Sequence, residues 1–358
     1  MPAQKDEVQE VIKYLRAKKL DQLGEDIKAL KKGKVIKPID QDELLEQEHK
    51  EVKIKTGTLI DEMIGGGLPP SCLDAVSSML LFGEYGSGKT QTGFTMCVEA
   101  PDDVVYIDSE GSYRAERVKQ ICEERGKDWN EVKKKIHLFR PTNWVQQIMV
   151  LNSIPSPADT HTGRVGLIIV DSLTKDFRGI EFAGRQALTT KQPLIREFIF
   201  QLEAIAKAFG CALIFTTQIY ETPNSNPFLP AWAGHKAVGG ASILHQPAFV
   251  IFLRRGSGNV RIAQMKDSSW QPLSERPFVI SAKGIEDIPE DAKARDALMK
   301  RVEKFDVKQK QELIKKNKRT KRAYNKCMKD AKEAGASVEE AELACEVFKP
   351  IKEGGSGG

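Results

Sequence analysis

Gly83-Glu84-Tyr85-Gly86-Ser87-Gly88-Lys89-Thr90 is the stretch that decides the fold of this chain. Its spacing is G-x-x-x-x-G-K-[ST], in which glycines let backbone N–H groups turn toward phosphate oxygens. An apolar run at residues 79–82 precedes the motif, and residues 91–98 have a helical pattern. Because a phosphate-binding loop requires this strand–loop–helix context, the sequence predicts an ATP- or GTP-binding protein.

The chemistry of the loop assigns a role to its last two residues. Lys89 is expected to reach the β- and γ-phosphates, and the Thr90 hydroxyl is expected to ligate Mg²⁺. The phosphates themselves are expected to lie at the N-terminus of the following helix, where the backbone carries partial positive charge. A glycine-rich turn without phosphate binding is the alternative, and the flanking pattern argues against it.

The composition is typical of a globular protein in water, and the net charge is slightly positive. The 358 residues are 40% hydrophobic and 29% charged, with a net charge of +5. No apolar run approaches the roughly 18 residues of a membrane span, and the first 30 residues are too charged for a signal peptide. We therefore expect a cytoplasmic, nucleoid-associated protein, or a nuclear one if the source is eukaryotic, without a membrane partner.

The six cysteines are scattered through the chain without any C-x-x-C pair. Disulfide frameworks and zinc sites normally show clustered or regularly spaced cysteines. The sequence therefore predicts reduced thiols, most of them buried.

Three zones follow one another along the chain. Residues 1–55 have the pattern of short amphipathic helices and a linker, and residues 56–288 alternate short apolar strands with helical segments. Residues 289–352 are charged and helix-forming, with a possible capping box at Ser337 and Glu340. Residues 353–358 resemble a flexible linker appended for expression. This organisation predicts an α/β core with a helical segment on each side.

The predicted core strands cover residues 79–82, 104–107, 167–170, 212–215, 249–253, 260–265 and 278–280. Residues 256–259, Gly-Ser-Gly-Asn, predict a hairpin turn between the fifth and sixth of these strands. The core is therefore expected to have a mostly parallel sheet that ends in an antiparallel section.

Polar residues stand directly after several of these strands. In a parallel α/β sheet the carboxyl ends of the strands line one crevice, so we expect these side chains to meet. Asp171 is expected to hold Mg²⁺ through water, and Glu110 to position and polarise an attacking water. Gln218 is expected to sense the γ-phosphate. The alternatives are a helix cap or ion-pair partner for Glu110 and an ordinary turn residue for Gln218.

A basic segment covers residues 304–322, with nine Lys or Arg against Asp306 and Glu312. Such a run suits a phosphate backbone, and it equally suits a solvated helix face. The sequence leaves both interpretations open.

Several ordered motifs in residues 83–289 resemble the RadA branch of the RecA family of DNA strand-exchange recombinases. The matching segments are residues 83–91 (GEYGSGKTQ), 106–117 (YIDSEGSYRAER), 169–174 (IVDSLT), 182–186 (FAGRQ), 239–240 (GG) and 283–287 (KGIED). The resemblance implies a RecA-like P-loop ATPase core, with ATP and Mg²⁺ as cofactors and DNA as partner. It extends the nucleotide-binding set to Gln91 and Arg117, the latter stacked on adenine.

The resemblance also implies roles for residues outside the phosphate loop. Glu110 falls at the catalytic glutamate, and Gln218 at the glutamine that links nucleotide state to DNA. Lys266 and Asp267 fall at a segment that caps ATP bound to a neighbouring subunit. The implied DNA-binding residues lie in two loops and a following helix: Arg178, Arg185, Lys191, Lys236, Gly239 and Gly240.

Departures from the family pattern leave two functions open. The Phe-x-x-Ala segment that usually joins the family's subunits is not found ahead of the core, since the first phenylalanine is Phe82. Lys191 stands where the family usually has Arg, and Ala241 where it has His or Asn. One reading is an ATP-dependent recombinase that forms filaments on single-stranded DNA and then engages double-stranded DNA. The other is a paralogue that modulates another recombinase's filament, and a DNA-independent ATPase is more remote.

Overall fold

The computed structural model describes residues 13, 40–42, 45–46, 52–71, 76–179, 185–221, 235–239, 243–333 and 345. These residues belong to two compact units, 1–289 and 290–358. The predicted N-terminal helices, the capping box at Ser337 and Glu340, and the tail at 353–358 lie outside the described residues.

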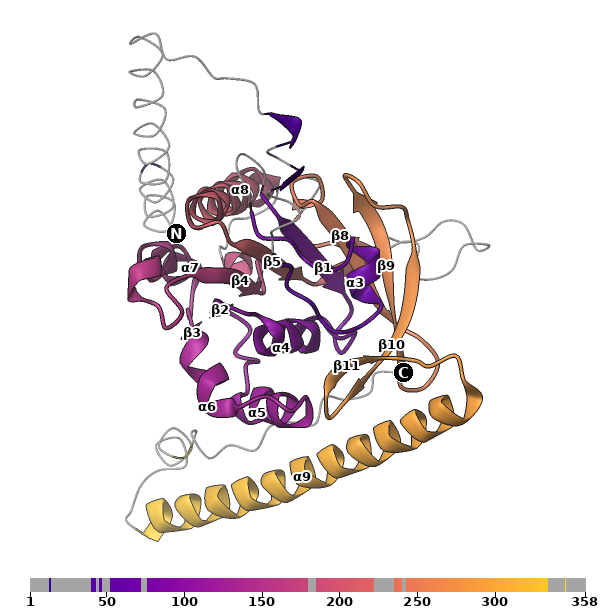
Figure 1. Cartoon of the computed structure of the whole chain (residues 1–358). Helices are drawn as coiled ribbons and strands as arrows, with labels where there is room; N and C mark the ends of the chain where they lie inside the picture. Colours follow the sequence, from indigo (N-terminus) through magenta and orange to yellow (C-terminus); the bar gives the residue numbers. More distant parts are fainter. Residues whose placement is uncertain are drawn as a thin grey trace. The chain divides into compact units, whose positions relative to one another are not determined.

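A nine-stranded sheet forms the centre of the first unit, in the order β11-β10-β9-β8-β1-β5-β4-β2-β3 (Figure 1). Neighbouring strands are parallel from β8 through β1, β5, β4 and β2 to β3. At the other end of the sheet, each of the pairs β8–β9, β9–β10 and β10–β11 is antiparallel. The strands are β1 Ser78–Gly83, β2 Asp103–Asp108, β3 Ile136–Phe139, β4 Val165–Asp171, β5 Ala212–Thr217, β8 Phe249–Arg255, β9 Val260–Ser268, β10 Glu275–Ser281 and β11 Gly284–Asp287. The predicted mostly parallel sheet with an antiparallel end is confirmed.

Helices cover both faces of this sheet. On one face lie α4 (Lys89–Glu99) and α5 (Ala115–Glu124), and on the other α7 (Trp144–Met149) and α8 (Arg185–Phe209) (Figure 1). Shorter helical elements are α3 Ile60–Met63, α6 Trp129–Val132, η1 Lys133–Lys135, η2 Val150–Asn152, η3 Pro157–Asp159 and η4 Asp176–Gly179. The layered α/β class predicted for the core is therefore observed.

Successive residues of the central strands supply two separate hydrophobic cores. In β1, Leu81 belongs to the core that includes Phe94 of α4, whereas its neighbour Leu80 belongs to the core that includes Phe198 of α8. All are at most 1% exposed. Because side chains alternate across a strand, a continuous apolar run fits only a strand that is covered on both faces. This explains why the central strands read as unbroken apolar runs.

Four of the strands that the structure describes, β3, β6, β7 and β11, were not predicted from the sequence. β3 is short and half-exposed, and β11 reads Gly-Ile-Glu-Asp, so neither has a distinct apolar run. A two-stranded sheet of β6 (Ile219–Glu221) and β7 (His235–Ala237) lies within a segment expected to be a loop. The predicted turn at residues 256–259 is confirmed, because the N–H of Gly256 donates to the carbonyl of Val260 (2.9 Å).

The second unit contains α9, a helix of 42 residues at Ala292–Glu333. No helix among the described residues is long and apolar enough to cross a membrane.

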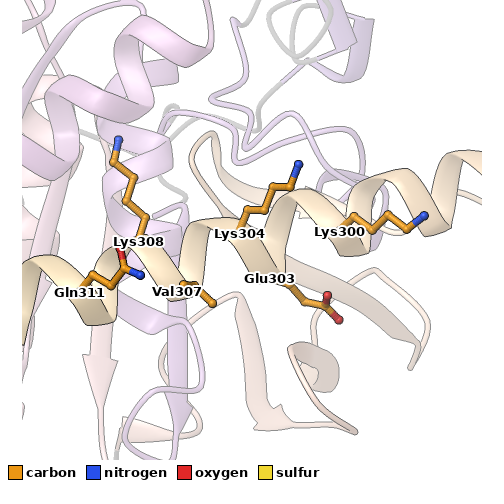
Figure 2. Close-up of a pocket in the computed structure, with 6 residues that line it drawn as sticks. All are labelled: Lys300, Glu303, Lys304, Val307, Lys308 and Gln311. Carbon is orange, nitrogen blue, oxygen red and sulfur yellow. The ribbon is translucent and has the colours of Figure 1, made fainter.

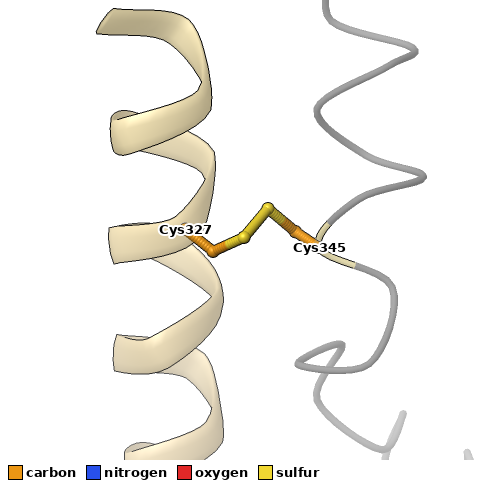
Figure 3. Close-up of a disulfide and its surroundings, with 2 residues drawn as sticks. All are labelled: Cys327 and Cys345. Carbon is orange, nitrogen blue, oxygen red and sulfur yellow. A yellow bond between two sulfur atoms is a disulfide. The ribbon is translucent and has the colours of Figure 1, made fainter. Parts of the chain in front are cut away.

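Helix α9 carries Cys327, which forms a disulfide with Cys345 (Figure 3). The prediction of reduced thiols is wrong for this pair. The two cysteines are 18 residues apart in the sequence, and their Cα atoms are 5.9 Å apart. Cys97, Cys122 and Cys211 are buried free thiols, as expected.

Gly284 at the start of β11 is required by both conformation and space. Its φ is +87°, and an added Cβ would lie 2.2 Å from Thr95 Oγ1 of α4. We expect Gly284→Ala to lower the free energy of unfolding by about 2–4 kcal/mol, from left-handed strain plus overpacking. Gly126→Ala is the control, since Gly126 has φ +73° with nothing within 4 Å of an added Cβ. Denaturant unfolding measures the free energy of unfolding of both variants. Equal losses in the two variants would contradict the role assigned to Thr95.

Candidate functional site

The predicted phosphate loop joins β1 to α4. Two of its glycines have positive φ, Gly86 at +74° and Gly88 at +111°. A Cβ on Gly83 would lie 2.0 Å from the backbone oxygen of Leu253, so the loop can approach β8 only with glycine there. The Lys89 ammonium donates to the carbonyls of Gly83 and Glu84, both at 2.7 Å. The loop is thus folded around its own lysine.

Two arginines outside the motif hold the same loop. Arg255 Nη2 donates to the carbonyl of Tyr85 (2.7 Å), and Arg261 Nε donates to that of Gly86 (2.9 Å). Both arginines flank the hairpin between β8 and β9, about 170 residues along the chain. Sequence reasoning missed them because a hairpin arginine carries no local signal of its distant partner.

Burial changes the acidity of Lys89. Desolvation lowers the pKa of its ammonium to about 8, although the carboxylates of Asp171, Glu110 and Glu84 oppose the shift. A negatively charged phosphate group beside the ammonium would raise this pKa again, because it favours the charged form. The charge of Lys89 therefore depends on whether a phosphate group is bound beside it.

The carboxylate of Asp171, at the end of β4, is the centre of the hydrogen-bond network. Its Oδ2 accepts from Thr90 Oγ1 (2.8 Å), Tyr106 Oη (2.9 Å) and Ser112 Oγ (3.4 Å), and its Oδ1 accepts from Thr216 Oγ1 (2.5 Å). Asp171 is 2% exposed. The pKa of the Tyr106 hydroxyl is well above its usual value, mainly because the group is buried and also because Asp171 is negatively charged. Tyr106 therefore stays protonated and donates its hydrogen bond.

Thr90 and Asp171 also fit the predicted Mg²⁺ site. Hydroxyl and carboxylate oxygens are the ligands that Mg²⁺ prefers, and it usually keeps several waters and substrate phosphates as further ligands. Within the described ranges, no group of three or more His, Cys, Asp or Glu side chains could hold a metal ion without such ligands. Thr90 and Asp171 thus supply two oxygen ligands of the kind that Mg²⁺ prefers, and waters and phosphate oxygens would have to supply the others.

Glu110 and Gln218, which lie beyond the ends of β2 and β5, meet beside the phosphate loop. Gln218 Nε2 donates to Glu110 Oε1 at 3.3 Å. Asp108, at the end of β2, accepts from the N–H groups of Ser112 (2.9 Å) and Tyr113 (3.1 Å). The strand order places β2 and β5 on the two sides of β4, so the meeting is a product of the sheet.

Arg117 of α5 is held at the edge of the site by four hydrogen bonds. Nε donates to Gln91 Oε1 (2.9 Å), Nη1 to Gln120 Oε1 (2.6 Å) and the carbonyl of Ala282 (3.1 Å), and Nη2 to the carbonyl of Ser281 (2.5 Å). Burial lowers the pKa of its guanidinium to about 10. Gln91 and Arg117, which the resemblance grouped, are therefore in direct contact.

The backbone of Gln218 also anchors the β6–β7 hairpin. Its carbonyl accepts from the N–H of Val238 (2.8 Å), and Thr217 Oγ1 donates to the carbonyl of Val238 (3.0 Å). Next to Val238, Gly239 has φ +120°, and an added Cβ would lie 2.6 Å from Ile243 Cδ1. Lys236 is exposed on β7. One residue thus touches the candidate catalytic carboxylate and the base of this hairpin.

The remaining predicted residues lie in different parts of the first unit. Lys266 and Asp267 are exposed near the end of β9, and the Lys266 ammonium lies 5.4 Å from the centre of the Phe252 ring. Although the residue is exposed, partial desolvation of its ammonium group lowers the pKa of Lys266. Lys191 is half-buried in α8. The backbones of Arg178 and Arg185 lie in η4 and at the start of α8, and Gly240 is outside the described residues.

Comparisons with known proteins agree with this geometry. A model of the Rad51 family matches residues 47–288. Over 245 residues the chain is 34% identical to the DNA repair and recombination protein RadA of Aeropyrum pernix, covering 66% of this chain and 73% of that protein. Over 237 residues it is 32% identical to the meiotic recombination protein DMC1 of Saccharomyces cerevisiae, covering 64% and 69%. The chain belongs to the Rad51 family, as the resemblance to the RadA and RecA recombinases predicted.

Proposed function

We propose that this chain is an ATP-dependent DNA recombinase, which assembles on single-stranded DNA and promotes homologous pairing and strand exchange in repair. The observation that carries the proposal is the position of Gln218. Its amide contacts Glu110 beside the phosphate loop, and its carbonyl holds the β6–β7 hairpin through Val238. A change at the phosphate site is therefore transmitted to the proposed DNA loop through one residue. The names of the relatives support the same role in recombination.

Residues 83–91 and Arg117 would bind the nucleotide. Lys89 would donate to the phosphates in place of the carbonyls of Gly83 and Glu84, and Arg117 would stack on adenine from the edge of the site. Mg²⁺, when bound by Thr90 and through water by Asp171, would neutralise charge on the phosphates.

Hydrolysis would follow from the position of Glu110. Its carboxylate orients a water and accepts a proton as the water oxygen bonds to the γ-phosphorus. The bond from that phosphorus to the bridging oxygen breaks, and ADP and phosphate leave. Gln218, at 3.3 Å from Glu110, registers the loss of the γ-phosphate. Lys266 and Asp267 would complete the site of a neighbouring subunit, because they lie exposed on β9.

DNA binding would use the two loops that begin near β4 and β5. Arg178, Arg185 and Lys191 are the proposed contacts from the first loop and α8, and Lys236, Gly239 and Gly240 from the second. The base of the second loop is fixed, since Val238 is tied to both Thr217 and Gln218. A loop whose base is fixed suits an extended strand of variable sequence.

A mediator paralogue is the second candidate function. It is favoured by one observation, the lack of a Phe-x-x-Ala segment ahead of the core. Such a protein would bind ATP at the same site and modify the filament of another recombinase. Glu110 and Gln218 in contact favour the recombinase, because a mediator that does not turn over ATP has no need of them.

The pH dependence of nucleotide binding should report on Lys89. Below about pH 8 the ammonium is already charged, so affinity should be constant. Above that pH binding must take up a proton, because phosphates raise the lysine pKa, and affinity should fall by up to about tenfold per pH unit. Titration with a fluorescent ATP analogue would measure this. In Lys89→Arg the guanidinium stays charged, so any remaining affinity should not change with pH; a flat curve for the unaltered chain would refute the assignment.

Glu110→Gln should separate binding from turnover. The amide keeps the size of the side chain and removes the proton acceptor, so ATP hydrolysis should fall by about 10²-fold or more with little change in nucleotide affinity. Steady-state hydrolysis and equilibrium titration measure the two effects. Glu124→Gln, on the exposed end of α5, is the matched control and should be unaffected. Normal turnover in Glu110→Gln would remove Glu110 from the mechanism.

Imaging and strand-exchange assays distinguish the two candidate functions. With ATP and single-stranded DNA, the proposed recombinase should form continuous filaments and convert homologous duplex into joint molecules. A mediator should form discrete small complexes and exchange no strands by itself. Filaments that appear only in the presence of ATP and DNA would support the recombinase, and small complexes without exchange would support the mediator.

A further inference from the structure

The helix α9 has a row of positive charges that runs along one side of it. At about 100° per residue, positions seven or eight apart lie on the same face of a helix. Lys and Arg recur at that spacing along the whole of α9, and we call this row the basic stripe: Lys293, Lys300, Lys308, Lys315, Arg322 and Lys329. Lys304, Lys318 and Lys326 fall within the same sector, and all of these side chains are exposed.

The opposite face of α9 has the reverse character. Leu298 and Val302 are 3% and 1% exposed, and Tyr324 and Cys327 are half-buried. The acidic residues at 296, 303, 306, 312 and 330 fall outside the sector of the basic stripe, and Glu333 at its end pairs with Lys329 at 3.5 Å. The charge separation is therefore a property of the helix rather than of a basic composition alone.

A shallow hollow marks the first half of the stripe (Figure 2). It is lined by Lys300, Glu303, Lys304, Val307, Lys308 and Gln311. Lys304 and Lys308 extend from the same side of the helix in Figure 2. Neighbouring ammonium groups repel one another, so a row of them is stabilised by a polyanion that displaces their counterions.

The length and straightness of the stripe suit a duplex. From Lys293 to Lys329 the helix rises by about 54 Å, at about 1.5 Å per residue. Double-stranded DNA has one phosphate per about 1.7 Å of axis and stays nearly straight over this distance, since its persistence length is about 500 Å. A rigid row of charges can therefore contact a duplex without bending it.

The aromatic residues of α9 argue against a single strand as the partner. Proteins that bind single strands without sequence preference stack bases on exposed aromatic side chains. Phe305 and Tyr324, the aromatic residues of α9, are half-buried and lie outside the basic stripe. In a duplex the bases are already stacked, so charge alone is enough.

We infer that the basic stripe of α9 binds the phosphate backbone of double-stranded DNA without sequence preference. The inference rests on the proposed function only in that the chain acts on DNA. Its residues are different from those of the two proposed DNA loops, and its binding needs no nucleotide. Duplex DNA held along α9 would be available to a strand-exchange reaction in the core.

The test uses the full chain without nucleotide and a 30-base-pair duplex, with a dT₃₀ strand as the second probe. Lys304→Gln, Lys308→Gln and Arg322→Gln together remove three charges from the stripe. The slope of log affinity against log salt should then decrease in magnitude by about 2.7, or 0.9 per phosphate contact. At moderate salt, duplex affinity should fall by at least about tenfold. The affinity for dT₃₀ should change much less.

A matched triple variant controls for net charge and helix propensity. Arg295→Gln, Lys310→Gln and Lys321→Gln remove three exposed charges from other sides of α9 and should leave the salt slope within about one unit. Exchanging Lys304→Arg, Lys308→Arg and Arg322→Lys keeps the charge and should keep the affinity. Circular dichroism checks that each variant retains its helix.

Three outcomes would overturn the inference: no duplex binding by the unaltered chain, equal losses in the stripe and control variants, or an equal loss for duplex and dT₃₀. These outcomes are distinct from failure of the proposed function. The stripe variant should keep its ATP turnover and its filaments on single-stranded DNA, whereas Glu110→Gln should keep duplex binding without nucleotide.

Discussion

The buried carboxylate of Asp171 is the constraint on which the candidate site depends. Moving a carboxylate out of water costs several kcal/mol unless hydrogen bonds replace its hydration. Hydroxyl groups of Thr90, Tyr106, Ser112 and Thr216 supply those hydrogen bonds. Each bond to a charged group contributes about 1.5–3 kcal/mol, so the set offsets the cost of burial. In return, α4, β2 and β5 are fixed around the end of β4.

The same arrangement explains why Glu110 and Gln218 meet. The backbone N–H groups of Ser109 and Glu110 donate to the carbonyl of Asp171, which fixes the start of the loop after β2. Thr217 Oγ1 approaches Thr174 Oγ1 at 2.9 Å, which ties the end of β5 to the segment after β4. The backbone of Gln218 is therefore held beside the β6–β7 sheet, and under the proposed function a ligand that displaces its side chain would act on that sheet. This short path is the physical basis of the proposed coupling between nucleotide and DNA.

The two units use charge in different ways. In the first unit, charged side chains at the site make specific contacts, such as those of Arg255 and Arg261 with the backbone of the phosphate loop. In α9, the lysines and arginines of the basic stripe are exposed and recur with the period of the helix. The first arrangement suits recognition of one ligand with precise geometry. The second suits a polymer of repeating charge, for which register matters little.

The sequence by itself determined the α/β class, the phosphate loop and the buried central strands. These features depend on local pattern: the glycine spacing at residues 83–90 and apolar runs that only a doubly covered strand can satisfy. It also supplied Glu110, Asp171 and Gln218 as candidates, because each follows a strand, although their roles remain proposals. The sequence predicted that these three side chains lie near one another, but it did not predict which of them are in contact. That depends on the order of the strands in the sheet, which no single segment specifies.

Tertiary structure alone decided the features that join distant segments. Arg255 and Arg261 reach the phosphate loop across about 170 residues, and Cys327 pairs with Cys345 although their spacing carries no disulfide signal. The short strands β3 and β11 pair with β2 and β10 at the two ends of the sheet, and this pairing between segments is not visible in their few residues alone. Local sequence specifies which segments can form a strand, loop or helix, whereas burial and pairing between segments determine which groups finally meet.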